Sequence, residues 1–257
     1  MFKKNYIVLL FFSSLYAQSL DQLFTDGNNY FNKNLYSRAI ENYNQILDNG
    51  FFTQDLYLNL GNAYFEVEDY GNARWSFEMG LKLNPLNEDL NNNNNVNKLF
   101  IENYIEVPKD SILDNVNAFY QLLSINQFIL VNAILILITS MLFFIYRLFE
   151  IQIFKKLFTY SLILSFTFIL LTFTKNLWDK NNKFGIITKN ESVLYSAPYK
   201  NESIEISTFY NGNKVKILQS TDSWFEISSF DGRKGWIRAQ DIRNLYWYEI
   251  FSSSFIY

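Results

Sequence analysis

Two long apolar runs constrain this chain more than any other feature. Residues 128–146 and 157–174 contain no Asp, Glu, Lys or Arg. At a rise of about 1.5 Å per residue, helices of these lengths are roughly 27 to 29 Å long, close to the bilayer core of about 30 Å. The pattern predicts two transmembrane helices joined by a loop at 147–156. The fold class is thus a multidomain α and β membrane protein, with soluble segments before and after the hairpin.

The polar side chains within these runs leave two interpretations open. Three polar residues of the first run, Asn132, Thr139 and Ser140, could bond across the hairpin to polar residues of the second: Thr159, Ser161, Ser165, Thr167 and Thr172. The alternative is that such groups bond the backbone of their own helix or pack between helices. No ionisable group lies inside either run, which argues against an ion or proton pathway.

The chain contains neither cysteine nor histidine. This composition removes thiol nucleophiles, disulfides, haem ligation through His or Cys, most zinc sites and the commonest general base. No Ser-Lys or paired-carboxylate arrangement stands out among the remaining residues. We therefore expect no enzymatic activity, no cofactor and no metal site.

The N-terminus has the layout of a secretory signal peptide over residues 1–17. Lys3 and Lys4 precede an apolar core at 6–12, and Ala17 stands before the expected cleavage site. An uncleaved anchor is the alternative, and in both cases the following segment is exported. Positive charges do not decide how the hairpin is oriented across the membrane, because both of its ends carry three of them. The loop between the apolar runs contains Arg147, Lys155 and Lys156, and the segment after the second run contains Lys175, Lys180 and Lys183. With the N-terminal domain exported, two crossings return the C-terminus to the same side.

A repeat of 34 residues occupies the segment before the membrane. Five residues recur 34 positions later with the same kind of side chain, which is either small or a large apolar or aromatic group. Leu23, Gly27, Tyr30, Ala39 and Tyr43 correspond in this order to Tyr57, Gly61, Tyr64, Ala73 and Phe77. The spacing resembles the tetratricopeptide (TPR) signature, an antiparallel helix pair per repeat. Small residues would allow the two helices of a pair to approach closely. The second helices are predicted at 34–47 and 69–83, after turns at 32–35 and 68–71.

The predicted TPR domain covers residues 18–104 and ends in a polar helix at 87–103 that would cap the repeats. A linker at 105–127 would connect it to the membrane. From residue 18 to residue 104 there are 5 Lys and Arg against 12 Asp and Glu, a net charge of −7. This charge disfavours nucleic acid and acidic ligands and would attract a basic or apolar partner, although solubility alone explains it too.

The TPR resemblance implies a concave peptide-binding groove lined by the first helix of each repeat. The residues that it places there are Asp21, Phe24, Asn28, Phe31 and Asn32, with Asp55, Leu58, Asn62, Phe65 and Glu66 from the second repeat. The amides of Asn28 and Asn62 could hold a peptide backbone, because they both donate and accept hydrogen bonds. The alternative is that Asn is merely abundant on wet helix faces of this Asn-rich chain.

After the membrane segment the sequence changes to short β-branched and aromatic runs. Strands are predicted at 186–188, 192–198, 215–220, 224–229 and 234–239, separated by polar turns and an Asp231-Gly232 hairpin. A small antiparallel barrel fits this pattern. The runs VLYSAP, YNGNKVKIL, WFEI and DGRKGWI resemble the bacterial SH3 domain over 184–245, above all through the Gly-Trp that follows the hairpin. An aromatic tail at 246–257 follows.

The SH3 resemblance implies an aromatic ligand groove for a peptide or for the peptide stems of the cell wall. Four residues would line it: Tyr195, Tyr210, Trp224 and Trp236. The alternative for the two tryptophans is that they fill a small core. The segment 181–244 has 9 Lys and Arg against 7 Asp and Glu, so it offers no basic patch for nucleic acid.

The complete order of segments resembles the BatE-type proteins of the bacterial aerotolerance operon. The SINQF stretch at 124–128, entering the first apolar run, is similar to that family as well. The resemblance implies a two-pass protein of the bacterial inner membrane whose TPR and SH3-like domains face the periplasm. It further implies partners among MoxR-type ATPases and von Willebrand A membrane proteins, and a link to envelope stress. A non-enzymatic adaptor is the leading hypothesis, and a peptidoglycan-binding sensor or anchor is the alternative.

Overall fold

A computed structural model describes residues 19–107, 119–120, 122–199 and 203–246. The predicted signal peptide and all of the aromatic tail except Tyr246 lie outside these residues. The chain divides into two compact units. The first contains the N-terminal helices, here called the helical domain (19–81 and 87–107), and the C-terminal strands, called the strand domain (184–246). The second contains the apolar hairpin.

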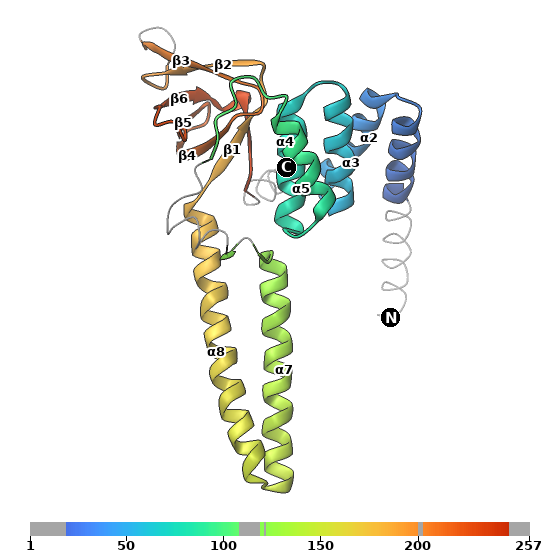
Figure 1. The fold of residues 1–257 in the computed structure, drawn as a ribbon, viewed down its shortest axis with the longest axis vertical. Coiled ribbons are helices and arrows are strands. Elements are labelled where there is room, and N and C mark those ends of the chain that lie inside the picture. The colour runs from blue at the N-terminus through green and yellow to red at the C-terminus, as the bar shows by residue number, and fades with distance from the viewer. Residues whose placement is uncertain (1–18, 108–118, 121, 200–202, 247–257) are drawn as a thin grey trace, which may run out of the picture. The chain divides into compact units, whose positions relative to one another are not determined.

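The helical domain consists of antiparallel helices in sequence order (Figure 1). Residues 19–32 are helical, and they are followed by α2 (Tyr36–Asp48), α3 (Gln54–Glu66), α4 (Tyr70–Leu83) and α5 (Glu88–Lys98). The turn expected at 68–71 is shorter than predicted, because Tyr70 and Gly71 already belong to α4. The missing side chain of Gly71 allows α4 to approach Asn211 and Ile187 of the strand domain closely.

Small residues permit the close packing of these helices. A Cβ atom on Gly27 would lie 2.6 Å from the Tyr43 ring, and one on Gly61 would lie 2.4 Å from the Phe77 ring. Both aromatic side chains are almost completely buried. Because the two contacts are 34 residues apart, the periodicity seen in the sequence corresponds to two equivalent packing sites.

The helix α5 repeats the pattern of the first helices a third time. The turns after the first two equivalent helices contain residues with positive φ, Asn34 (58°) and Glu68 (61°), and Asn103 (47°) takes the same conformation after α5. After Asn103, the described residues 104–107 form neither a helix nor a strand. The backbone N–H of Ile105 donates to Asn213 Oδ1 at 2.9 Å, so this segment joins the strand domain.

The strand domain is one antiparallel sheet in the order β3-β2-β6-β5-β4-β1-β7. Its strands are β1 (Phe184–Ile187), β2 (Glu191–Tyr195), β3 (Glu205–Tyr210), β4 (Lys214–Ser220), β5 (Trp224–Ser228), β6 (Lys234–Arg238) and β7 (Ile242–Asn244). The sequence did not predict β3 and β7. The sheet encloses an aliphatic core of residues such as Leu194, Val215, Ile227 and Ile237, and Tyr246 also belongs to it.

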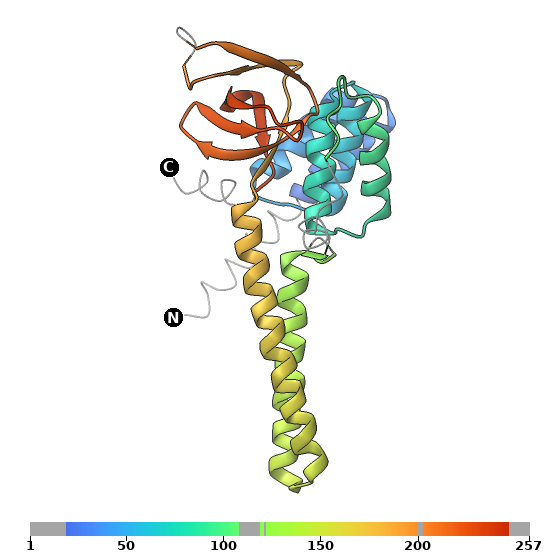
Figure 2. The same ribbon diagram turned by 60° about the vertical axis from the view of Figure 1, so that its left-hand side comes forward.

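The hairpin is formed by α7 (Ile125–Phe149) and α8 (Gln152–Asn181), both long and apolar enough to cross a membrane. At about 1.5 Å per residue the helices are about 37 and 45 Å long, longer than the apolar runs. The loop expected at 147–156 is reduced to residues 150–151, because the backbone hydrogen bonds continue past the first charged side chains. Both views show the two helices side by side (Figures 1 and 2).

Polar side chains do connect the two helices of the hairpin. Asn132 Nδ2 donates to Thr172 Oγ1 at 2.6 Å, and the hydroxyls of Thr139 and Ser161 are hydrogen-bonded at 2.7 Å. Asn132 and Thr139 also donate to their own helix, to the carbonyls of Phe128 and Leu135. Both interpretations of these residues are therefore realised at once.

Candidate functional site

Four asparagines of the helical domain form two equivalent hydrogen-bonded pairs, called the amide row. Asn59 Nδ2 donates to Asn28 Oδ1 at 2.9 Å, and Asn93 Nδ2 donates to Asn62 Oδ1 at 2.7 Å. Each pair joins the first helices of successive repeats. The carbonyl oxygens of Asn28 and Asn62 are thus already used within the protein, which fixes the orientation of both amides. Sequence reasoning missed Asn59 and Asn93, although their own 34-residue spacing was visible.

The other predicted groove residues divide into packed and exposed groups. Phe24 lies 6.0 Å from the Tyr43 ring, and Phe31 and Phe65 make edge contacts with Tyr36 and Tyr70. Leu58 packs against the buried cluster that contains Phe77. The exposed members, available to a partner without any rearrangement, are Asp21, Asn32, Asp55 and Glu66. Asp55 also lies in the first turn of α3, where a carboxylate is favoured by the helix dipole.

The half-buried Trp224 and Trp236 form an aromatic surface on the outer face of the strand domain, and Tyr195 lies beside them but is itself buried, with 7% of its surface exposed. Tyr195 pairs with Trp236 across β2 and β6, and its ring meets the Trp224 ring edge-on with centroids 5.5 Å apart. Both tryptophans are half-buried and neither belongs to the aliphatic core, so they do not fill it. Lys234 and Glu226 form an ion pair at 3.1 Å. It lies beside the tryptophans, because Glu226 on β5 pairs with Trp236 on β6.

Tyr210 does not belong to this aromatic surface. On the β2–β3 hairpin it pairs with Glu191, whereas Tyr195 pairs with Glu205 at the other end of the same two strands. Four residues of strand separate the two tyrosines by about 13 Å. Tyr210 instead begins the turn that contacts the helical domain.

Comparison with known proteins bears on this domain alone. The family model of the bacterial SH3 domain matches residues 194–243. No curated protein matches the chain. The match includes the last residues of β2 and all of β3 to β6, and it therefore contains Tyr195, Trp224 and Trp236. It supports the SH3-like assignment of the strands and is compatible with binding of protein or peptidoglycan.

The contact between the helical and strand domains contains a buried cluster of charges. Arg74 on α4, only 1% exposed, donates through Nη1 to the carbonyl of Gly212 at 2.7 Å and through Nε to Glu78 at 3.1 Å. Lys214 on β4 forms an ion pair with the other carboxylate oxygen of Glu78. Although burial alone would raise the pKa of Glu78, the charges of Lys214 and Arg74 outweigh it and lower that pKa from 4.5 to about 2.

A second group of contacts joins α4 to β7. Trp75 Nε1 donates to the carbonyl of Asn244 at 2.8 Å. The Arg243 guanidinium lies 3.4 Å from the centre of the Trp75 ring and donates to Asn72 at 3.0 Å. Burial lowers the pKa of Arg243, and the oxygen atoms of Tyr64 and Asp69 act in the opposite direction. Hydrogen bonds and ring contacts from α4 to β7 and to the turn before β4 thus hold the helical and strand domains together.

Within the described residues, no group of three or more carboxylates is arranged to hold a metal ion. The candidate sites are two surfaces: the amide row with its exposed acids, and the aromatic surface of the strand domain.

Proposed function

We propose that this chain is a non-enzymatic membrane adaptor whose helical domain captures a segment of a protein partner. In this proposal the helical domain is a TPR domain, a reading supported by the 34-residue spacing of the Gly27–Tyr43 and Gly61–Phe77 contacts. The chain would cross the bacterial inner membrane through α7 and α8, with the helical and strand domains in the periplasm. The exported N-terminus predicted from the sequence supports this orientation.

The position of the strand domain is the observation that carries the proposal. Its contacts with the helical domain use α4, Tyr64 and the segment after α5. The amide row uses other side chains, on the first helices of the repeats. The strand domain therefore occupies one side of the repeats and leaves the proposed groove for a partner.

The preoriented amides suit an extended peptide segment. Because the oxygens of Asn28 and Asn62 are held by protein donors, their Nδ2 groups can donate to backbone carbonyls of a bound segment. Exposed acids nearby favour a segment carrying Lys or Arg. The resemblance to BatE-type proteins suggests von Willebrand A membrane proteins or a MoxR-type ATPase complex as the source of that segment.

Reversing the exposed charges tests the groove. We expect the double variant Asp55→Lys, Glu66→Lys to reduce recovery of the partner after crosslinking in membranes by about tenfold or more, because like charges then face a basic segment. The matched control is Glu41→Lys, Asp48→Lys, which changes the net charge equally at exposed positions of α2. Equal recovery from both variants would remove the groove from the mechanism.

A cell-wall anchor is the second candidate function, favoured by the aromatic surface of the SH3-like domain. The half-buried rings of Trp224 and Trp236 can stack on sugars or peptides while their bodies stay partly buried beside Tyr195. Trp224→Ala and Trp236→Ala are expected to remove the detergent-solubilised chain from the pellet of purified peptidoglycan, while Tyr210→Ala stays bound. If the unaltered chain does not sediment with wall material, this second function is rejected.

A further inference from the structure

Three positive charges surround the hairpin close to its loop. Arg147 lies two residues before the end of α7, and Lys155 and Lys156 follow the first three residues of α8. At about 1.5 Å per residue, all three are roughly 3 to 6 Å from the helix ends that meet at the loop, so they lie at nearly the same level. We call these three residues the cation belt.

The cation belt lacks an anionic partner in the part of the chain that the structure describes. All three residues are exposed, and none forms an ion pair with a described residue. Glu150, in the loop, is the only carboxylate of the sequence between residues 115 and 178. Three cations and one carboxylate give the tip, residues 147–156, a net charge of +2.

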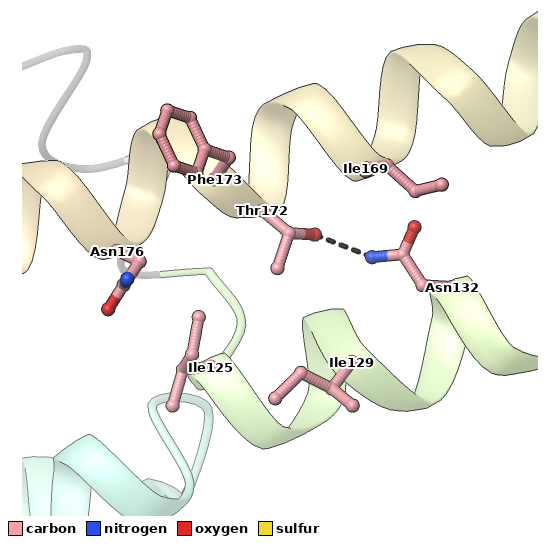
Figure 3. Close-up of a pocket in the computed structure, with 7 residues that line it drawn as sticks. All are labelled: Ile125, Ile129, Asn132, Ile169, Thr172, Phe173 and Asn176. Atoms are coloured by element: carbon pink, nitrogen blue, oxygen red, sulfur yellow. Dashed lines mark hydrogen bonds between the residues drawn. The ribbon is translucent and has the colours of Figure 1, made fainter.

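Polar groups at the other end of the hairpin are bonded within the chain. Asn132 donates to Thr172 at 2.6 Å, as Figure 3 shows. The buried Lys175 donates to the carbonyl of Tyr120 at 2.8 Å and forms an ion pair with Asp179 at 3.3 Å. The hairpin therefore supplies its own partners for Lys175, whereas the cations of the belt face outward.

The cation belt also lies where the apolar runs end. Residues 128–146 stop directly before Arg147, and residues 157–174 begin directly after Lys156. With these runs in the hydrocarbon core, the belt lies at the edge of the core, inside a headgroup layer that is roughly 5 to 7 Å thick on each side. Beyond the belt the tip is apolar and exposed, which suits this interfacial layer better than open water: Leu148, Phe149, Ile151 and Ile153.

We propose that the cation belt binds the phosphate groups of anionic lipids in the leaflet that the tip reaches. A guanidinium offers paired donors to phosphate oxygens, and an ammonium offers a compact charge. Helix stability does not explain Lys155, because it lies in the first turn of α8, where the helix dipole disfavours a cation. Exposed apolar side chains on both sides of the belt, such as Phe144 and Phe149, favour a lipid over free phosphate, because acyl chains can pack against them.

Binding of defined lipids to the full-length chain in detergent tests this proposal, which rests on the membrane insertion proposed above and is independent of the adaptor role. The chain is titrated with phosphatidylglycerol or with phosphatidylcholine of the same acyl chains, and bound lipid is counted by native mass spectrometry. We expect phosphatidylglycerol to bind at least about tenfold more tightly, since each cation near an anionic surface contributes a factor of about five.

Two matched double variants locate the binding site. Lys155→Gln, Lys156→Gln is expected to lower the preference for phosphatidylglycerol about tenfold or more. Lys180→Gln, Lys183→Gln removes the same charge at the other end of the hairpin and should change the preference less than about threefold. Glu150→Gln removes the carboxylate of the tip and should raise the preference up to about fivefold, a gain that a damaged hairpin would not show.

Several outcomes would overturn the proposal. Equal binding of the two lipids, equal losses from the two double variants, or a preference lowered by Glu150→Gln would each do so. Displacement of phosphatidylglycerol by inorganic phosphate would assign the belt to a free anion. An acidic protein that co-purifies with the chain and is lost from Lys155→Gln, Lys156→Gln at unchanged lipid preference would assign it to a protein. Binding of neither lipid would contradict the membrane insertion as well, so the two failures are distinguishable.

Discussion

Replacing Arg74 with alanine is expected to lower the free energy of unfolding of the helical and strand domains by about 3 to 5 kcal/mol, the usual effect of breaking a buried ion pair. Without its guanidinium, Glu78 keeps Lys214 as its remaining ion-pair partner, and the carbonyl of Gly212 loses the Nη1 donor. Denaturant unfolding in detergent, followed by tryptophan fluorescence, measures the change, because Trp75 lies in the same contact.

The control for this variant is Arg38→Ala on α2. Arg38 is exposed and lies 5.6 Å from the Tyr30 ring centre, so its loss should lower the free energy of unfolding by about 1 kcal/mol or less. Equal destabilisation by the two variants would mean that the buried charges contribute no more than a surface contact does.

Acidity provides a second measurement on the same variant. The pKa of Glu78 is lowered from 4.5 to about 2 in the folded chain, so its ionic stabilisation is complete above about pH 4.5 and is lost as the pH falls toward 2. For a shift of this size the contribution is about 3 kcal/mol. The difference between wild type and Arg74→Ala should therefore be largest near neutral pH and should shrink in acid. A difference that stays constant down to about pH 2 would contradict this origin.

The sequence was informative wherever the physical signal is local. The lack of charge in 128–146 and 157–174 predicted the two long helices, and the 34-residue spacing located the packing of Gly27 on Tyr43 and Gly61 on Phe77. The alternation of apolar residues with an Asp-Gly hairpin predicted a strand domain that the family match supports. Each of these patterns is formed by residues within one helix or strand, or within two that follow each other in the sequence.

The contact between the two soluble domains was not predictable in this way. In sequence, Arg74 and Glu78 resemble an ordinary pair of exposed charges one helical turn apart. Their burial depends on Lys214 and Gly212, more than 130 residues away. The segment 105–107 was similarly predicted to be the start of a linker, because nothing local shows that Ile105 packs against the core of the strand domain.

The candidate sites show the same limit. Asn28 and Asn62 were identified by type and spacing, but their orientation depends on Asn59 and Asn93 from the following helices. Tyr210 was grouped with Tyr195 because the SH3 resemblance implies a groove lined by aromatic residues. Strand register, which the sequence did not give, places the two side chains at opposite ends of the hairpin.

Gly71→Ala is expected to destabilise the chain, although alanine is the better helix former. In a helix interior this substitution normally stabilises by up to about 1 kcal/mol. Here a Cβ atom would lie 1.7 Å from Asn211 Oδ1 and 2.5 Å from the carbonyl oxygen of Ile187. Overpacking of this kind costs about 1 to 3 kcal/mol, so we expect a net loss measured by denaturant unfolding.

A second substitution distinguishes the two clashes. Asn211 has a side chain that can rotate away, and the double variant Gly71→Ala, Asn211→Ala removes that contact altogether. The carbonyl of Ile187 belongs to β1 and accepts from the N–H of Gly212 at 2.7 Å, so it cannot move without disturbing the turn that Arg74 also binds. We therefore expect the double variant to recover only part of the loss. A stabilising effect of Gly71→Ala alone would show that α4 and the strand domain do not pack this closely, and the large effect expected for Arg74→Ala would then disappear as well.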